Sequence, residues 1–250
     1  MFDSRYIVYD TLPSTNDTAK ELARKSATHG TVVMADRQTA GRGRMERSFF
    51  SPSGGVYLSL ILQADRVKLS TLGLLTAFTA LTLCQLLEEL YDKQPHIKWV
   101  NDVFLNNRKI SGVLTETVIN PQTQSIDWVV LGIGINFDTP AREFPQELWA
   151  IAGSIFPHGK PATASRDQLV SALVERLLDM VENADEALLL AGYRQRALFP
   201  GQPIMVYQVN QPAYEAIMVG IDDQARLIVS PKGGIETTLC HGEISIRPLV

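Results

Sequence analysis

Three arginines, Arg42, Arg44 and Arg47, stand within six residues of a segment that also contains two glycines. Gly41 and Gly43 can take positive φ, and loops of this kind turn their backbone N–H groups outward as an anion-binding nest. Arginine adds a fixed charge on a planar group that matches a phosphate or a carboxylate. The segment therefore predicts a loop that binds a small, multiply charged anion. The alternative is a solvated basic turn.

A polar pair, Asn101 and Asp102, interrupts an apolar segment that begins after Lys98. Such a pair either ends a strand in a turn or directs its side chains toward a site. Asp102 could bind a metal or a polar ligand, and Lys98 could neutralise a phosphate. Lys109 begins the next apolar segment, where a lysine is either solvated or a point charge able to bridge a carboxylate and a phosphate.

Glycines recur inside two of these apolar segments. Gly112 would let the backbone approach a partner closely, and Gly132 and Gly134 leave a backbone face open either to a flat ligand or to close packing. The latter pair is not a dinucleotide fingerprint, because the third glycine and the helix after it are missing. No segment matches a P-loop, a G-x-S-x-G or an H-E-x-x-H motif, so covalent catalysis and zinc chemistry have little support.

The elements that must position these residues follow from capping and hydrophobic patterning. Ser14, with Asp17 three residues later, begins a helix that runs to about Lys25, and Ser165 with Gln168 begins another. The strands expected before residue 200 cover 31–35, 55–62, 97–105 (broken by the polar pair), 108–116 and 127–136, with a hairpin turn at 106–107. Further helices are expected over 70–92 and 146–152. The helix that begins at Ser165 should run to about 182, and another helix should follow it to about 198.

The pattern changes after Pro200 to closely spaced short strands, expected over 203–208, 214–221, 226–230, 236–241 and 243–247. About 50 residues of closely spaced short strands are typical of a small β-barrel. The sequence therefore predicts two domains, 1–199 and 200–250.

Composition excludes several classes of protein. The 250 residues are 45% hydrophobic and 20% charged, which is ordinary for a globular protein. The net charge of −4 disfavours a general nucleic-acid binder, so a local cluster of cations indicates a small anion instead. Cys84 and Cys240 form no disulfide or zinc pattern. The N-terminal segment lacks a secretory signal, and the uncharged run 69–87 is interrupted by polar residues, so we expect a buried helix, no membrane association and a cytoplasmic location.

Taken in order, these motifs resemble those of the biotin protein ligase family. They are Ser14-Thr15-Asn16, Gln38-Thr39-Ala40-Gly41-Arg42-Gly43-Arg44, Lys98-Trp99-Val100-Asn101-Asp102, Arg108-Lys109-Ile110-Ser111-Gly112-Val113-Leu114-Thr115-Glu116, Gly132-Ile133-Gly134-Ile135-Asn136 and Gly242-Glu243-Ile244-Ser245-Ile246-Arg247. The resemblance implies an α+β fold. Its mixed-sheet catalytic domain is similar to class II aminoacyl-tRNA synthetases and is followed by an SH3-like barrel.

The resemblance also implies a two-step reaction. Biotin and ATP are the substrates, with Mg²⁺ on the triphosphate, and they give biotinyl-5′-AMP and pyrophosphate. A lysine of a biotin carboxyl carrier domain then takes the biotinyl group and releases AMP.

Family roles carry over to matching positions. The catalytic residues would be Lys109, Arg42, Arg44 and Asp102, of which Asp102 is also a candidate metal ligand and base. Biotin would meet Ser14, Thr15, Asn16, Gln38, Gly41, Arg42, Gly43, Lys109, Gly112, Gly132 and Gly134. The nucleotide would meet Arg44, Arg47, Phe49, Lys98, Trp99, Asn101 and Asn136.

The chain departs from the family pattern at several positions. Met45-Glu46-Arg47 replaces the more basic continuation of the loop, Phe49 replaces a tryptophan, and Val100 replaces a proline. These changes put affinity in doubt more than reaction type.

Two further expectations concern partners. Thirteen residues before Ser14 are too few for a helix-turn-helix, so we expect no direct DNA binding. Exposed strand edges at 127–136 could pair two subunits as a homodimer.

Two other functions remain as alternatives. One is a lipoate or octanoate ligase or transferase, which resembles this fold with different loop signatures. The other is a sensor that binds biotin or nucleotide and whose altered loop has lost adenylation.

Overall fold

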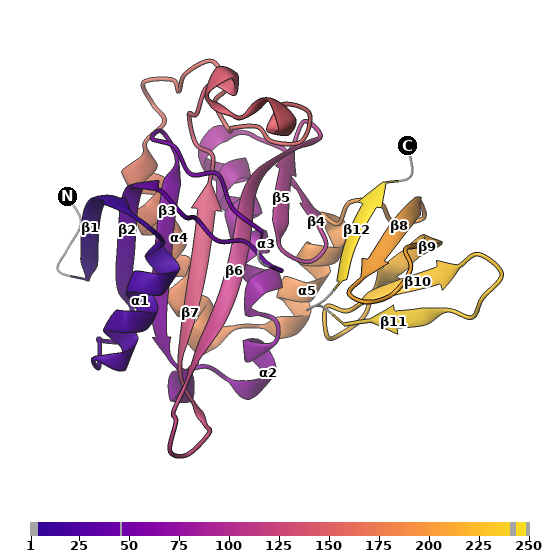
Figure 1. Ribbon diagram of the computed structural model, residues 1–250, viewed down its shortest axis with the longest axis horizontal. Coiled ribbons are helices and arrows are strands. Elements are labelled where there is room, and N and C mark those ends of the chain that lie inside the picture. Colours follow the sequence, from indigo (N-terminus) through magenta and orange to yellow (C-terminus); the bar gives the residue numbers. More distant parts are fainter. Residues whose placement is uncertain (1–4, 46, 241–243, 249–250) are drawn as a thin grey trace.

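The computed structural model describes residues 5–45, 47–240 and 244–248 of the chain. Glu46 of the basic loop and Gly242 and Glu243 of the C-terminal motif lie outside the described residues. The described chain forms a seven-stranded mixed sheet and a five-stranded antiparallel sheet that lie side by side (Figure 1). The predicted α+β class with a mixed sheet is confirmed.

The large sheet has the strand order β1-β2-β3-β7-β6-β5-β4. Its strands are β1 (Tyr6–Leu12), β2 (Thr31–Gln38), β3 (Val56–Gln63), β4 (His96–Lys98), β5 (Asp102–Leu105), β6 (Arg108–Ile119) and β7 (Ile126–Ile135). Only β1 and β2 run parallel among the pairs of this sheet. The sequence analysis missed β1, because this edge strand is largely exposed and has no clear apolar alternation.

Strand β7 lies inside the sheet, hydrogen-bonded to β3 on one side and β6 on the other. The expectation that residues 127–136 offer an exposed edge for pairing two subunits is therefore wrong. In the described chain, the edges of this sheet are β1 and β4.

Helices cover both faces of the large sheet (Figure 1). They are α1 (Thr15–Arg24), α2 (Leu69–Leu72), α3 (Leu75–Tyr91), α4 (Arg166–Asn183) and α5 (Glu186–Gln195). The main core joins β3, β6 and β7 to α3, α4 and α5, and a smaller core packs α1 on the opposite face. Because β3 is buried on both faces, Leu60 belongs to one core and Ile61 to the other, which explains its unbroken apolar run.

The predicted capping residues are confirmed. Ser14 precedes α1 and its hydroxyl accepts a hydrogen bond from the Asp17 N–H, and Ser165 does the same for Gln168 at α4. Asn106 has a positive φ of 50° in the turn between β5 and β6, as the hairpin prediction requires.

Three predicted elements differ in the structure. The helix over 70–92 is divided into α2 and α3 at Gly73, a residue of low helix propensity. The segment 97–105 is a hairpin of β4 and β5 whose turn is Trp99-Val100-Asn101, so Asp102 begins a strand. The helix expected near 146–152 is replaced by two short 3-10 turns, Ala141–Glu143 and Gln146–Leu148.

The five short C-terminal strands are confirmed as β8 (Pro203–Gln208), β9 (Tyr214–Ile221), β10 (Leu227–Pro231), β11 (Thr237–Leu239) and β12 (Ile244–Pro248). Their sheet has the order β11-β10-β9-β8-β12 and packs its inner face on the main core. Among the described residues, no helix is both long and apolar enough to cross a membrane.

Candidate active site

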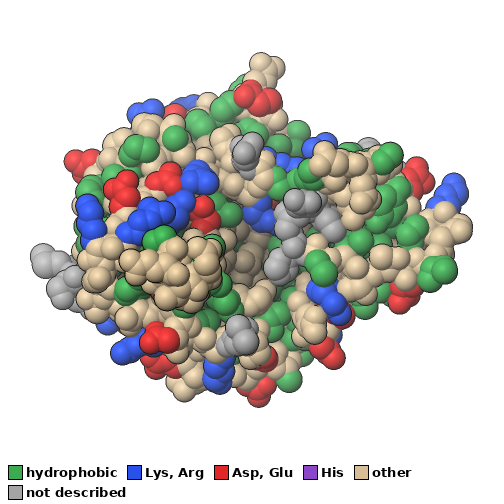
Figure 2. All heavy atoms as spheres, turned by 60° about the horizontal axis from the view of Figure 1, so that its bottom comes forward, with side chains coloured by type: hydrophobic (Ala, Val, Ile, Leu, Met, Phe, Trp, Pro, Cys, Tyr) green, Lys and Arg blue, Asp and Glu red, His purple; other side chains and the backbone are tan. Residues whose placement is uncertain are grey.

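A pocket opens between the start of α1, the end of β2, the basic loop and the middle of β6 and β7. It encloses about 320 Å³, including space open to solvent. Its lining residues are Ser14, Thr15, Asn16, Gln38, Arg42, Phe49, Gly112, Leu114, Gly132, Ile133 and Gly134. Figure 2 shows a hollow near the centre of one face, with acidic and basic side chains gathered along one side of it. Eight predicted biotin residues therefore meet in one cavity, although they come from four separate motifs.

One end of the pocket is polar and uncharged. The N–H and the hydroxyl of Thr15 both donate to Gln38 Oε1, at 2.8 and 3.1 Å, and the Gln38 amide donates to Ser51 Oγ at 2.9 Å. Ser59 Oγ lies 2.8 Å from Thr15 Oγ1. Groups held in this way can bind a neutral polar ring without moving.

Gly132 makes room for the side chain of Asn16. A Cβ atom at position 132 would overlap the Asn16 amide. That amide is fixed on both sides, because its oxygen accepts from Ser59 at 2.6 Å and its nitrogen donates to Glu116 at 2.8 Å. At Gly132, the open backbone face that was predicted for a flat ligand or for close packing is occupied by the Asn16 side chain.

Gly134 and Gly112 lie under the ring of Phe49. A Cβ atom at Gly134 would stand 2.6 Å from this ring, and one at Gly112 would stand 3.5 Å from it. The ring also packs edge-on against Tyr57 and lies 5.7 Å from Lys109 Nζ. Phe49 therefore forms a wall of the pocket and separates its apolar part from the charged side.

The basic loop is a closed hairpin and not an open nest. The Gly43 N–H donates to Arg47 O at 2.7 Å, and the Phe49 N–H donates to Gly41 O at 2.8 Å. Among the described residues of the loop, Met45 has a positive φ, of 57°, and neither glycine does. A Cβ atom at Gly41 would overlap the Phe49 carbonyl, so this glycine is required by the loop itself.

Arg42 is paired with two acids, Asp17 and Glu116, that the sequence analysis did not assign to the site. Its guanidinium lies 2.6 Å from Asp17 and 3.5 Å from Glu116, and Lys20 lies 2.9 Å from the same Glu116 carboxylate. Partial burial alone would raise the pKa of Asp17, but hydrogen bonds from Lys20 and Arg42 outweigh it and lower the pKa. Lys20 could have been predicted as a neighbour of the site, because it follows Asn16 by four residues and therefore lies on the same face of the helix.

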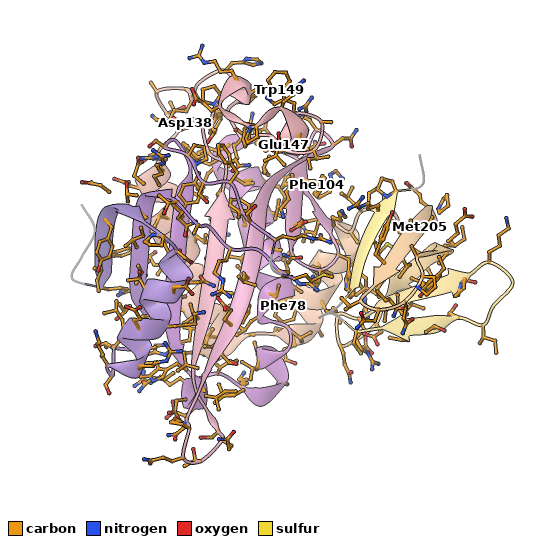
Figure 3. All side chains as sticks on the ribbon, in the orientation of Figure 1. Phe78, Phe104, Asp138, Glu147, Trp149 and Met205 are labelled. Atoms are coloured by element: carbon orange, nitrogen blue, oxygen red, sulfur yellow. The ribbon has the colours of Figure 1, made fainter. Side chains whose placement is uncertain are left out.

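Lys109 and Asp102 form an ion pair of 2.6 Å across the β5–β6 ladder. The Lys109 side chain is 32% exposed and paired, so it is not the freely solvated lysine that was one of the two alternatives from the sequence. The Lys109 N–H donates to Ile151 O, and the Gly153 N–H donates to Lys109 O, so the loop around 151–153 holds its backbone. Trp149, which Figure 3 labels at the top of the view, belongs to the same loop.

Further cations surround this pair. Burial lowers the pKa of Lys98, the charge of Asp102 opposes that shift, and the positive charges of Lys109, Arg247 and Arg47 add to it. Arg44 donates to Asn101 Oδ1 at 3.2 Å, and its burial lowers its pKa. The predicted nucleotide residues Arg44, Arg47 and Lys98 are thus brought into one electropositive region with Lys109.

Two other predicted nucleotide residues are buried in the scaffold. Trp99 is 4% exposed and its N–H donates to Ala225 O at 2.9 Å, so this donor is already used. Asn136 is 3% exposed and donates to Gly153 O at 2.8 Å, while its Oδ1 has no partner among the described residues. The described residues contain no group of three or more His, Cys, Asp or Glu side chains that could hold a metal ion.

Comparison with known proteins agrees with this site. The model of the "Biotin/lipoate A/B protein ligase family" matches residues 8–136, which include every pocket residue. A bifunctional ligase/repressor BirA from Bacillus subtilis is 35% identical over 239 residues, which are 92% of this chain and 70% of the relative. The chain belongs to the biotin/lipoate A/B protein ligase family.

Two other relatives match this chain over most of their own length. A biotin–[acetyl-CoA-carboxylase] ligase from Mycobacterium tuberculosis is 29% identical, over 94% of this chain and 87% of the relative. The biotin protein ligase of Aquifex aeolicus, solved with biotin and ATP, superposes with a TM-score of 0.80 at 26% identity and covers 99% of this chain and 100% of its own. The predicted family and enzyme class, a ligase, are confirmed.

Proposed function

We propose that this chain is an ATP-dependent biotin protein ligase, which forms biotinyl-5′-AMP and transfers biotin to a lysine of a biotin carboxyl carrier domain. The observation that carries the proposal is a neutral pocket that adjoins a group of cations, because Phe49 and Gly112 line the pocket and also lie beside Lys109. The neutral polar network surrounds Thr15 and Gln38, and the cations surround Lys109. The names of the relatives, together with the biotin and ATP bound to the Aquifex aeolicus enzyme, support the choice of substrates.

In the first step, a carboxylate oxygen of biotin attacks the α-phosphorus of ATP, and the bond to the pyrophosphate oxygen breaks. Two anions must approach each other, so fixed positive charges are needed before the reaction begins. We assign this role to Lys109, Arg42 and Arg44. The uncharged network with Ser14, Thr15 and Gln38 would hold the ureido ring, and the apolar wall of Phe49 would exclude water.

In the second step, a neutral lysine amine of the carrier domain attacks the acyl carbon, and the bond to AMP breaks. The acceptor must lose a proton, and we propose Asp102 as the group that takes it. Its ion pair with Lys109 places the two groups on the same side of the site. Asp102 also fits one place in a magnesium shell, whose other oxygens would come from the triphosphate and from water.

The domain assignment is part of the proposal. We propose that residues 1–199 are the catalytic domain and that residues 200–250 form an SH3-like barrel. The five antiparallel strands β8–β12 support this assignment.

The deciding experiment measures pyrophosphate release from ATP with biotin, with lipoate and with neither acid, followed by transfer to a carrier domain. We expect release and transfer with biotin alone. Pyrophosphate release with lipoate would instead indicate a lipoate or octanoate ligase of the same family. Biotin binding without release would mean a sensor.

The pairing of Arg42 with Asp17 predicts a gain of affinity on removing the acid. In Asp17→Asn, biotin should bind more tightly by about two- to fivefold, because an exposed ion pair that competes for Arg42 is worth roughly 0.4–1 kcal/mol. Calorimetric titration with biotin measures this change. The matched control is Glu21→Gln, an exposed acid on the same helix. Unchanged affinity in Asp17→Asn would remove Arg42 from the biotin carboxylate site.

A further inference from the structure

The turn Trp99-Val100-Asn101 is held by three separate parts of the chain. The indole N–H of Trp99 donates to Ala225 O at 2.9 Å. The Tyr193 hydroxyl, on α5, donates to Val100 O at 3.0 Å. Asn101 exchanges two hydrogen bonds with Val113 on β6, at 2.9 and 3.1 Å. Each residue of the turn is therefore fixed by a different partner.

The partner of Trp99 belongs to the turn between β9 and β10 of the C-terminal sheet. Ala225 has a positive φ of 54° in this turn. The Asp222 carboxylate shapes the turn by accepting from the Gln224 and Arg226 N–H groups, both at 2.9 Å, and from Arg226 Nε at 2.6 Å. The turn is therefore built to hold one carbonyl in place.

Helix α5 is tied to the same C-terminal turn. Arg194 donates to Ile221 O at 2.8 Å and to Asp223 Oδ1 at 2.7 Å. It is the neighbour of Tyr193, which holds Val100. The C-terminal turn thus holds Trp99 directly, and it is tied through Arg194 to the helix whose Tyr193 holds Val100.

The turn leads directly to the charged groups of the site. Asn101 Oδ1 accepts from Arg44, and Asp102 pairs with Lys109. Because one residue separates Trp99 from Asn101, a displacement of Trp99 would strain the two hydrogen bonds between Asn101 and Val113 that place Asn101 and, next to it, Asp102. Trp99 itself is 4% exposed and is not among the residues that line the pocket described above.

We infer that Trp99 is a positioning residue, through which the C-terminal sheet sets the place of Asn101 and Asp102 against Arg44 and Lys109. The hydrogen bond from its indole to Ala225 O makes the β9–β10 turn a part of the active-site scaffold. The catalytic consequence rests on the proposed ligase function, while the physical link does not.

The first test is Trp99→Phe, which keeps a ring and removes the N–H. We expect kcat for pyrophosphate release to fall by about 10- to 100-fold, because small misplacements of reacting groups have effects of this size. The KM for biotin should change by less than about twofold, because the ring-binding end of the pocket is built from α1, β2 and β7, and the expected loss lies in the positioning of the reacting groups. A fall in kcat with an equal rise in KM, or no change in either, would overturn the inference.

The matched control is Trp128→Phe. Trp128 lies on β7 and packs against the smaller core beside α1, away from the C-terminal sheet. It should show wild-type kcat and KM. An equal loss in this control would mean a general effect of losing a tryptophan.

A double-mutant cycle locates the coupling. Asp222→Ala removes the oxygens that accept from the Gln224 and Arg226 N–H groups, so it loosens the turn that holds Ala225 and should lower kcat at unchanged KM for biotin. In the Trp99→Phe background it should have no further effect, because the hydrogen bond that transmits it is already gone. Additive losses would contradict the inference. If Trp99→Phe does not fold, the single variant Asp222→Ala tests the inference, by the same fall in kcat at unchanged KM for biotin.

Amide hydrogen exchange gives a readout that needs no activity. The Val113 N–H, which donates to Asn101 O, should exchange faster in Trp99→Phe and at the wild-type rate in Trp128→Phe. Unchanged protection in Trp99→Phe would overturn the positioning role. If the wild-type protein releases no pyrophosphate with biotin, the proposed function fails, and this measurement still decides the physical link.

Discussion

Replacing Lys109 with alanine is expected to slow pyrophosphate release from ATP and biotin by about two to three orders of magnitude, the usual effect of removing one preorganised charge from a reacting centre. Lys109 lies 2.6 Å from Asp102 and shares its region with Lys98, Arg47 and Arg247. Without its ammonium group, the Asp102 carboxylate would face the incoming polyanion with less compensation. The biotin KM should change less than kcat, because the charge acts mainly on the reacting groups.

The fold should survive this substitution. The Lys109–Asp102 pair is partly exposed, so its loss should lower the free energy of unfolding by about 1 kcal/mol or less. A suitable control is Lys93→Ala, which removes a lysine that lies 5.3 Å from the ring of Phe156. A wild-type rate of release in Lys109→Ala, with the control also unchanged, would exclude Lys109 from the mechanism.

Replacing Gly132 with alanine is expected to weaken biotin binding by about 100-fold or more, because the new Cβ would overlap the Asn16 amide. Asn16 would have to leave its hydrogen bonds with Ser59 and Glu116, at 2.6 and 2.8 Å. Its displaced side chain would then enter the pocket that it lines. Isothermal titration with biotin measures the loss directly.

The same substitution should lower the free energy of unfolding by about 2–4 kcal/mol, because it combines a steric overlap with buried polar groups left unpaired. Thermal denaturation measures this term separately from binding. The matched control is Gly220→Ala, a strand glycine of β9 whose Cβ would have no atom within 4 Å. If Gly132→Ala were destabilised but bound biotin normally, Gly132 would be a structural residue only.

Local chemistry accounts for much that was predicted correctly. Ser14 and Ser165 cap helices because their hydroxyls accept from N–H groups three residues later. The turn at Asn106 follows from the tolerance of asparagine for positive φ. The strands β8 and β9 were found with their observed bounds, because short apolar segments between turn residues are a local signal. Family membership likewise followed from the order of short motifs.

The pairing of side chains could not be predicted in this way. Arg42 and Asp17 meet although 25 residues separate them, and Asn16 meets Glu116 across 100 residues. No local pattern encodes such contacts, because they depend on which strands become neighbours. The central position of β7 is of the same kind, since its own sequence is compatible with either an edge or an interior strand.

The helix caps, most strands, the motifs of the site and the family could be predicted from the sequence, because each depends on residues close together in the chain. Three features became visible only in the folded chain: what the glycines accommodate, which acids pair with Arg42 and Lys109, and the hydrogen bond from Trp99 to the C-terminal sheet. The physical reason is that these features arise from packing and hydrogen bonding between segments far apart in sequence. Their energies are settled by the arrangement of the sheets and not by local preference.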